Sequence, residues 1–249
     1  MKNEFSGLTA LVTGAGSGIG LAVAQNFHGS GAKVYGLDLV EGSMTPFAHF
    51  IKCDIGDSKS VSKAFTELAK QTSVIDILAN NAGIGATGTV EDLDEVEWQK
   101  ILNINVLGTS RVSAAAMSML RQSKCPAIVN TCSIAATAGL PGRAIYSASK
   151  GAIMSLTLAM AADHVKEGIR INCVNPGTTD TPWVDRLLAQ SQDPVAERAA
   201  LEARQPMGRL VSAHEVASAI AYLANPRQAS TTGTILAVDG GMQGLRLPR

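Results

Sequence analysis

Tyr146 and Lys150 stand four residues apart, a spacing that places a phenol and an ammonium on the same face of a helix. A free tyrosine is a poor base at neutral pH, because the pKa of a phenol is about 10. A neighbouring ammonium favours the phenolate. The pair is therefore suited to take a proton from an alcohol or to return one to a carbonyl oxygen.

A glycine-rich turn, residues 13–20, follows the apolar run 8–12 and precedes a helical pattern. Its glycines would let the backbone approach a pyrophosphate, while the N-terminus of the next helix faces the anion. A second strand pattern, 33–38, ends in Asp38, whose carboxylate can bind a ribose 2′-hydroxyl and would repel a 2′-phosphate. The sequence therefore predicts NAD rather than NADP. The alternative is a plain strand–helix turn beside an acidic strand end.

Motifs along nearly the whole chain resemble those of the short-chain dehydrogenase/reductase family. Each motif could occur by chance, but their order and spacing together are specific. Ser133 precedes Tyr146 by thirteen residues, as in the family pattern. The resemblance rests on the glycine motif 13–20, Asp54 with Ile55, the run 80–83, the segment 103–108, Ser133, Tyr146 with Lys150, and Pro176 with Gly177.

The resemblance implies a catalytic set of Asn105, Ser133, Tyr146 and Lys150. Ser133 would hydrogen-bond the substrate oxygen and stabilise its changing charge. Tyr146 would act as general base in oxidation and general acid in reduction. By resemblance, Lys150 would also hold the nicotinamide ribose. Asn105 resembles the residue that bends a helix and links a water relay to the lysine; the alternative is an amide that kinks the helix without a chemical role.

The same resemblance implies which residues bind the NAD cofactor. Asp54 would read the adenine amino group, and Ile55 would contribute backbone contacts. Thr179 and Thr181 would hold the nicotinamide amide and the diphosphate, although they could equally cap the next helix. The predicted cofactor site consists of Gly14, Ser17, Gly18, Ile19, Gly20, Asp38, Asp54, Ile55, Asn81, Gly83, Tyr146, Lys150, Pro176, Gly177, Thr179 and Thr181.

Arginines around Tyr146 indicate an acidic substrate. Arg143 precedes Tyr146 by three residues, and Arg186 and Arg204 lie in the polar segment 183–209, where the family carries its substrate lid. Arginine binds carboxylates through two parallel hydrogen bonds. The arrangement resembles the subgroup that contains cytosolic 3-hydroxybutyrate dehydrogenase and the 2-keto-3-deoxy-L-fuconate dehydrogenases of sugar-acid catabolism and L-fucose degradation. The alternative is a set of ordinary solvated charges.

The C-terminal tail, 242–249, is longer and more basic than is needed to end the last strand, which suggests a role for it. The resemblance implies tetramers in which one subunit's C-terminus approaches a neighbouring site. Arg246 or Arg249 would then close over a neighbour's acidic substrate; a frayed tail without function is the alternative. The predicted substrate site consists of Ser133, Arg143, Tyr146, Trp183, Arg186, Arg204 and Arg249.

Strand-like and helix-like patterns alternate along one domain, 1–249. Strands are predicted at 8–13, 33–38, 50–54, 75–80, 127–131, 170–175 and 234–239. Helices are predicted at 18–29, 58–72, 95–122, 146–167 and 213–223. The alternation predicts an α/β fold with a mostly parallel, doubly wound sheet. The resemblance implies a Rossmann-type sheet of seven strands in the order 3-2-1-4-5-6-7, with helices on both faces.

Polar motifs stand at the ends of six predicted strands. Ligands bind outside the carboxyl ends of the strands in such sheets, so these motifs predict one shared binding site. Buried structural residues alone would not place polar groups at six strand ends. The residues that mark the ends are Gly14, Asp38, Asp54, Asn80, Ser133 and Pro176.

The composition limits the partners. The 249 residues carry 21 Lys and Arg and 21 Asp and Glu, so a formal net charge of zero gives no electrostatic case for nucleic acid or an anionic membrane. No apolar segment has the length of a signal peptide or a membrane span, which predicts a cytoplasmic protein. Four cysteines without paired spacing indicate small buried side chains, and four scattered histidines predict no metal site.

The predicted function is hydride transfer between NAD and a secondary alcohol of a hydroxy acid or deoxy sugar acid, with 2-keto-3-deoxy-L-fuconate as the most specific candidate. The partner would be a small acidic molecule, and the resemblance implies a homotetramer. One alternative is a reductase of 3-oxoacyl thioesters or of a neutral sugar or polyol, which Asp38 disfavours when the cofactor is NADPH. Another is a non-catalytic nucleotide-sensing protein, which the intact catalytic set disfavours.

Overall fold

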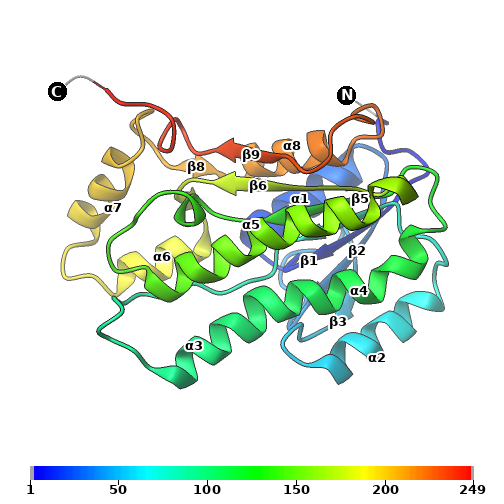
Figure 1. The fold of residues 1–249 in the computed structure, drawn as a ribbon, viewed down its shortest axis with the longest axis horizontal. Coiled ribbons are helices and arrows are strands. Elements are labelled where there is room, and N and C mark those ends of the chain that lie inside the picture. Colours follow the sequence, from blue (N-terminus) through cyan, green and yellow to red (C-terminus); the bar gives the residue numbers. More distant parts are fainter. Residues whose placement is uncertain (1–2, 248–249) are drawn as a thin grey trace.

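A parallel sheet of seven strands forms the centre of the molecule (Figure 1), in a computed structural model that describes residues 3–247. Across the sheet the order is β3-β2-β1-β4-β5-β6-β9, and each neighbouring pair is parallel. The α/β class and the predicted order are therefore confirmed, because β9 is the seventh strand of this sheet along the chain. The strands are β1 (Thr9–Thr13), β2 (Lys33–Asp38), β3 (His49–Lys52), β4 (Ile77–Asn80), β5 (Ala127–Thr131), β6 (Arg170–Pro176) and β9 (Ile235–Val238).

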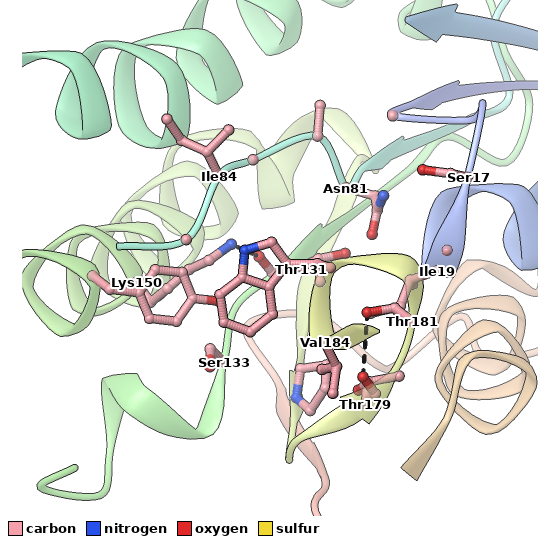
Figure 2. A pocket seen from close by; sticks show the side chains of 18 of the residues that line it. Ser17, Ile19, Asn81, Ile84, Thr131, Ser133, Lys150, Thr179, Thr181 and Val184 are labelled. Atoms are coloured by element: carbon pink, nitrogen blue, oxygen red, sulfur yellow. Dashed lines mark hydrogen bonds between the residues drawn. The ribbon is translucent and has the colours of Figure 1, made fainter. Parts of the chain in front are cut away.

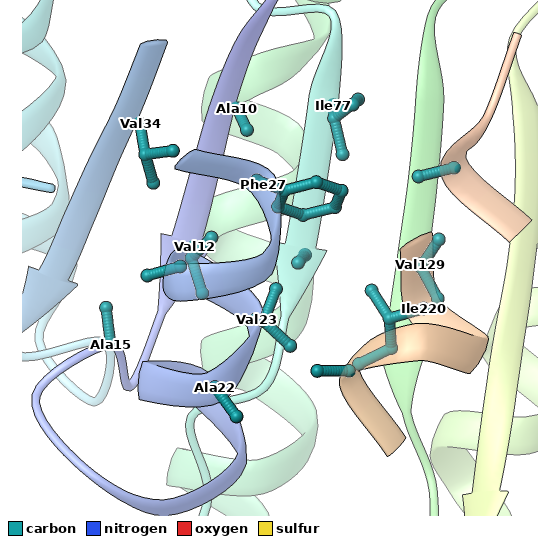
Figure 3. Close-up of a cluster of buried hydrophobic side chains, with 14 of the residues drawn as sticks. Ala10, Val12, Ala15, Ala22, Val23, Phe27, Val34, Ile77, Val129 and Ile220 are labelled. Atoms are coloured by element: carbon teal, nitrogen blue, oxygen red, sulfur yellow. The ribbon is translucent and has the colours of Figure 1, made fainter. Parts of the chain in front are cut away.

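Two helices, α1 (Gly18–Gly29) and α8 (Ala213–Ala224), cover one face of the sheet. Alternate residues of a strand point to opposite faces, so every second strand residue enters this layer. Figure 3 shows strand and helix side chains packed together there. They include Ala10, Val12, Val34, Ile77 and Val129 from the strands and Val23, Phe27 and Ile220 from the helices.

The opposite face receives the intervening strand residues, such as Leu11 between Ala10 and Val12. Three helices cover it: α2 (Ser58–Ala69), α4 (Thr109–Leu120) and α5 (Ala144–His164). Apolar side chains on both faces are what a parallel sheet covered on both sides requires. Polar motifs of the strands can therefore meet a ligand only at the strand ends.

One predicted helix, 95–122, is wrong as a single element. The segment forms α3 (Glu95–Leu102), a π-helix η1 (Asn103–Gly108) and then α4. Asn105 is buried in the π-helix, and its side-chain amide bonds both backbone groups of Ile84. A π-helical turn contains one residue more than an α-helical turn. In this turn the Asn105 side chain reaches its partner, Ile84. That partner lies 21 residues away, so the helical pattern of the segment could not reveal the interruption.

The segment between β6 and α8, for which the sequence predicts a polar substrate lid without assigned helices, contains two helices. They are α6 (Pro182–Ala189) and α7 (Pro194–Ala203), packed through Val184, Leu188 and Leu201. Each helix has a proline in its first turn, and Asp193 caps α7, so local signals for both were present. Short strands β7 (Thr179–Asp180) and β8 (Val211–Ser212) pair at the base of the insertion.

Strand β3 ends at Lys52, so Asp54 lies two residues beyond the strand instead of ending it. Helix α5 begins two residues before Tyr146 and continues into a 3₁₀ turn, η3 (Val165–Glu167). The other predicted elements match within three residues at each end. Within residues 3–247, no helix combines the length and apolarity needed to cross a bilayer.

Candidate active site

A cavity of about 540 Å³ lies at the carboxyl ends of the strands. Figure 2 shows Ser17, Asn81 and Thr181 on one side of this pocket and Ser133 and Lys150 on the other. The structure therefore brings nucleotide-binding and catalytic candidates to one cavity. The predicted residues that line it are Gly14, Ser17, Gly18, Ile19, Asp38, Asp54, Ile55, Asn81, Gly83, Ser133, Arg143, Tyr146, Lys150, Pro176, Gly177, Thr179, Thr181, Trp183, Arg186 and Arg204.

Two of the predicted residues that the structure describes do not line the cavity. Gly20 is buried behind the glycine turn, and Asn105 is buried in η1. Arg249 lies outside the described residues. Gly20 and Asn105 can therefore act on a ligand only through the residues that they hold in place.

Tyr146 and Lys150 lie one helical turn apart on α5, as their spacing predicted. The Lys150 Nζ atom is 5.8 Å from the centroid of the Tyr146 ring. The Lys150 side chain is buried, and its ammonium donates a hydrogen bond of 2.9 Å to the carbonyl oxygen of Thr131 at the end of β5. This bond fixes the cation near the phenol. The Thr131 carbonyl was not among the predicted site groups, because no side-chain pattern marks a backbone acceptor.

Ser133 precedes a 3₁₀ helix, η2 (Ile134–Ala136), directly after β5. Its hydroxyl oxygen accepts a hydrogen bond of 3.2 Å from the Ala135 backbone N–H. A hydroxyl that accepts one bond can still donate its own proton. Ser133 is therefore held in place and remains able to donate to an oxygen in the cavity.

The Asn105 amide connects three segments of the active site. Its oxygen accepts from the Ile84 N–H at 2.8 Å, and its nitrogen donates to the Ile84 carbonyl at 2.9 Å and to Ser149 Oγ at 3.0 Å. A Cβ added to Gly83 would lie 3.1 Å from Asn105 Oδ1 and 3.6 Å from Lys150 Nζ. Gly83 thus keeps the space between these two groups open. The water relay through Asn105 stays a prediction.

The glycine turn has the shape that an anionic dinucleotide requires. Gly14 and Gly18 have φ angles of +67° and +54°, which favour glycine. A Cβ on Gly20 would lie 2.0 Å from the Gly14 carbonyl oxygen. Ser17, the N-cap of α1, makes no side-chain capping bond, and the first turn has no acidic residue. The first amides of α1 are therefore open to an anion.

Asp38 is half-buried at the end of β2. One carboxylate oxygen accepts from the Gly16 N–H at 2.9 Å, and the other accepts from the Leu39 N–H at 2.7 Å. Each oxygen has a further lone pair for a ligand hydroxyl. Asp38 therefore supports the glycine turn as well as lining the cavity, and its selection of NAD stays a prediction.

Threonines hold the loops around the cavity. The buried Thr13 hydroxyl accepts from the N–H groups of Asn81 and Ala82, both at 2.9 Å, and so joins β1 to the loop after β4. Thr181 is the N-cap residue of α6, but its side chain makes no capping bond; its hydroxyl donates to the Thr179 carbonyl at 3.3 Å (Figure 2). The alternative that Thr181 caps this helix is therefore not realised.

Arg143 and Trp183 stack against each other on the wall of the cavity, with the guanidinium carbon 5.5 Å from the ring centroid. Arg143 Nη1 donates to the Ala86 carbonyl at 3.0 Å, so the rest of its fork stays available. Burial lowers the pKa of Arg143, and the positive charge of Arg204 adds to this effect, whereas Tyr146 and Glu197 oppose it. Arg143 is thus a partly desolvated cation beside Tyr146.

Gly85 is a site residue that the sequence reading missed. A Cβ at this position would lie 2.5 Å from Cζ2 of Trp183, so the indole packs directly on the Gly85 backbone. Gly85 lets α6 approach the loop after β4. The glycine itself was the available signal, because it follows the motif run 80–83 by two residues.

Cys132 lies beside Ser133 and lines the cavity, but it is buried and donates from Sγ to the Lys150 carbonyl at 3.0 Å. All four cysteines are free, and Cys125 is the half-buried exception to their predicted burial. Residues 3–247 contain no cluster of three or more His, Cys, Asp or Glu side chains that could hold a metal.

The C-terminal tail lies against its own chain as far as the structure describes it. The Gln243 side-chain oxygen accepts from Thr137 Oγ1 at 3.0 Å and from Asn175 Nδ2 at 3.1 Å. Arg246 donates to the carbonyls of Gln243 and Leu245. The tail is thereby anchored next to the η2 turn that follows Ser133. Its approach to a neighbouring site stays a prediction.

Known proteins match the chain over nearly its full length. A family model described as "Enoyl-(Acyl carrier protein) reductase" matches residues 14–243. The chain is 36% identical to 2-(S)-hydroxypropyl-CoM dehydrogenase 3 of Xanthobacter autotrophicus, over 97% of this chain and 99% of that protein. It is also 36% identical to cis-4-hydroxycyclohexanecarboxylate dehydrogenase of Sinomonas cyclohexanicum, over 97% and 98%.

A third relative is 3-oxoacyl-(acyl-carrier-protein) reductase of Salmonella typhimurium, with 33% identity over 96% of this chain and 98% of that protein. Among solved structures, ligand-free aldohexose dehydrogenase of Thermoplasma acidophilum has a TM-score of 0.93 and 32% identity, covering 100% of both chains. The substrates in the names of these relatives differ, whereas each protein matches this chain over nearly its full length. The chain therefore belongs to the short-chain dehydrogenase/reductase family, whose members typically use NAD or NADP, and it is an oxidoreductase that acts on alcohols or ketones.

Proposed function

We propose that this protein is an NAD-dependent dehydrogenase that oxidises a secondary alcohol of a hydroxy acid or a deoxy sugar acid. One observation carries the proposal: three arginines line the wall of the cavity that holds Tyr146, and none forms a salt bridge within the described part of the chain. These arginines are Arg143, Arg186 and Arg204. A carboxylate would satisfy cations that the protein leaves without an acidic partner.

In the proposed reaction, Ser133 donates a hydrogen bond to the substrate oxygen and Tyr146 accepts the hydroxyl proton. Lys150, fixed by the Thr131 carbonyl, keeps a positive charge beside the phenol that takes part in the proton transfer. Asn105 keeps Ile84 and Ser149 in place around them. When bound, NAD supplies the hydride acceptor. The glycine turn, Asp38, Thr179 in β7 and Thr181 at the start of α6 would hold it.

Two observations support an acidic substrate. Burial of Arg143 removes water that would otherwise solvate its charge, which strengthens its attraction for an anion. A relative whose name specifies a hydroxycyclohexanecarboxylate, which is a hydroxy acid, is 36% identical to this chain. Within this class we propose 2-keto-3-deoxy-L-fuconate as the first compound to test. A screen of hydroxy acids, deoxy-keto sugar acids and neutral sugars for NADH formation tests the proposal, and turnover of neutral compounds alone would reject it.

An Arg204→Gln variant is expected to raise the KM for the acidic substrate about tenfold or more, because a hydrogen bond to a charged group contributes about 1.5–3 kcal/mol. The neutral amide of the same acid should show the same KM in the variant and the wild type. Steady-state kinetics with this substrate pair make the comparison.

Arg198→Gln is the matched control, because Arg198 lies in α7, whose C-cap residue is Arg204. Arg198 already pairs with Asp180 and Glu202, and it does not line the cavity. Its replacement should leave the KM for the acid unchanged. An equal increase of the KM for the acid in both variants would show that Arg204 contributes only to the overall positive charge of segment 183–209.

An Asp38→Ala variant is expected to narrow the preference for NAD over NADP about tenfold, measured as the ratio of kcat/KM values. The variant loses a charged acceptor for the ribose hydroxyl and the repulsion of a 2′-phosphate. Glu41→Gln removes a nearby acid that does not line the cavity and should keep the preference. An unchanged ratio of kcat/KM values in Asp38→Ala would show that Asp38 does not select NAD over NADP. Thermal unfolding checks that the variant is folded.

We also propose a cytoplasmic homotetramer. Exposed apolar side chains on adjacent elements support self-association: Leu107 on η1 is 51% exposed and Leu158 on α5 is 43% exposed. Burying such side chains against another copy would be favourable. Light scattering coupled to gel filtration should give a mass about four times the 25.8 kDa of one chain. A single-chain mass at micromolar concentration would contradict the proposal.

A further inference from the structure

Arg111 on α4 makes four hydrogen bonds and, within residues 3–247, no salt bridge. Nε donates to Ser58 Oγ at 3.1 Å, and Nη1 donates to the carbonyls of Ile55 at 3.3 Å and Asn103 at 3.1 Å. Nη2 donates to Asn103 Oδ1 at 2.7 Å. A planar fork with several fixed donors is well suited to joining backbone segments. Arg111 thereby joins the loop after β3 to the first residue of η1.

Two further contacts tighten this junction. Asn103 Nδ2 donates to the Gly56 carbonyl at 3.0 Å, so the loop and the π-helix are also bonded directly. A Cβ on Gly108 would lie 2.8 Å from Cδ1 of Ile55. The π-helix therefore packs directly on the Ile55 side chain. A displacement of the loop after β3, which carries Ile55, must also displace η1.

The two ends of this connection have different roles in the proposed mechanism. Asp54 and Ile55 line the cavity where the adenosine part of the cofactor is expected. Asn105 lies two residues after Asn103 in η1 and bonds Ile84 and Ser149 around the catalytic pair. Arg111 belongs to none of the motifs that the sequence shows.

We infer that Arg111 is a positioning residue that couples nucleotide contact at the loop Asp54–Asp57 to the placement of Asn105 in the π-helix. The inference rests on the proposed cofactor site. Binding energy from a part of the cofactor remote from the reaction would thus contribute to the arrangement of the catalytic groups. Arg111 itself touches neither the cavity nor the reacting atoms.

Hydrogen–deuterium exchange of the full chain with and without ADP tests the coupling without measuring activity. In the wild type, ADP should slow exchange at residues 53–58 and also at residues 103–108. In Arg111→Met, protection at 53–58 should remain and protection at 103–108 should be lost. Retained protection at 103–108 in this variant, or its absence from the wild type, overturns the inference. Absence of protection everywhere overturns the proposed cofactor site as well.

Two further variants separate coupling from loss of structure. Arg121→Met removes an exposed arginine that follows the same helix and pairs with Glu167, and it should behave as the wild type. Arg111→Lys keeps the charge but lacks the fork, so it should lose the protection at 103–108 even if Arg111→Met fails to fold. Protection in Arg111→Lys equal to that of the wild type overturns the role of the fork.

A double-mutant cycle then tests the route through Asn105. In an otherwise wild-type chain, Arg111→Met should lower kcat about tenfold, because displaced catalytic groups slow the reaction. The KM of the substrate should stay unchanged. In an Asn105→Ala background the same change should have no further effect on kcat. An equal loss of kcat in both backgrounds would show that Arg111 does not act through Asn105.

Discussion

A Tyr146→Phe variant is expected to lose about 10²–10⁴-fold in kcat, the usual contribution of a positioned general acid or base. The change removes one hydroxyl and keeps the ring that lies 5.8 Å from the Lys150 ammonium. The fold around α5 should therefore survive, and the Kd for NAD should change little. Stopped-flow measurement of NADH formation gives the rate, and calorimetry gives the affinity.

Ser147→Ala provides the control for a hydroxyl lost from the same helix turn, because Ser147 does not line the cavity. It should keep the wild-type kcat. Turnover by Tyr146→Phe at the wild-type rate would refute the acid–base assignment. A joint loss of kcat and NAD affinity would instead show that the ring position had changed.

A Gly20→Ala variant is expected to weaken NAD binding about tenfold or more, equivalent to about 1.4 kcal/mol. The added Cβ would lie 2.0 Å from the Gly14 carbonyl oxygen and 2.7 Å from Asn81 Nδ2. Both contacts are too short to persist, so the glycine turn must move away from α1. Overpacking of this kind costs about 1–3 kcal/mol of stability. Calorimetric titration with NAD and thermal unfolding measure the two effects.

Gly29→Ala is a matched control in the same helix. No heavy atom lies within 4 Å of a Cβ built at Gly29, and its backbone is helical. Alanine there should keep NAD affinity and raise stability by up to about 1 kcal/mol, because glycine is a poor helix former. Wild-type affinity in Gly20→Ala would mean that the close packing of the turn is not needed for the cofactor.

Periodic patterns in the sequence located the seven strands of the sheet and four of the eight α-helices within residues 3–247, α1, α2, α5 and α8, whereas the order of the strands was implied by the family resemblance. Strand patterns such as 33–38 and 127–131 match the observed strands to the residue, because apolar side chains are needed on both faces of a covered parallel sheet. Helix 95–122 was wrong as one element. Its apolar pattern continues through η1, so the pattern alone does not mark the π-turn, although the family resemblance implied a helix bend at Asn105. In the structure, Asn105 lies in this π-turn and bonds Ile84.

The candidate site was also predictable where motifs stand at strand ends. Gly14, Asp38, Ser133 and Pro176 all reach the cavity because parallel strands bring their carboxyl ends to one edge. The supporting contacts were not predictable. Thr13, Gly85 and Arg111 act by bonding or packing against segments far along the chain. Gly85 could have been noticed as a glycine near a motif, but none of the three residue types indicates which distant segment is the partner.

The sequence by itself indicates the family, the parallel α/β sheet and the chemistry available at its edge, because these depend on side-chain types and on the order and spacing of motifs along the chain. Contacts between distant segments establish how the site is held together. Asn105 meets Ile84 across 21 residues, and Arg111 meets Ile55 across 56. Such contacts form only after the sheet has brought the segments together, so no short window of the chain contains both partners.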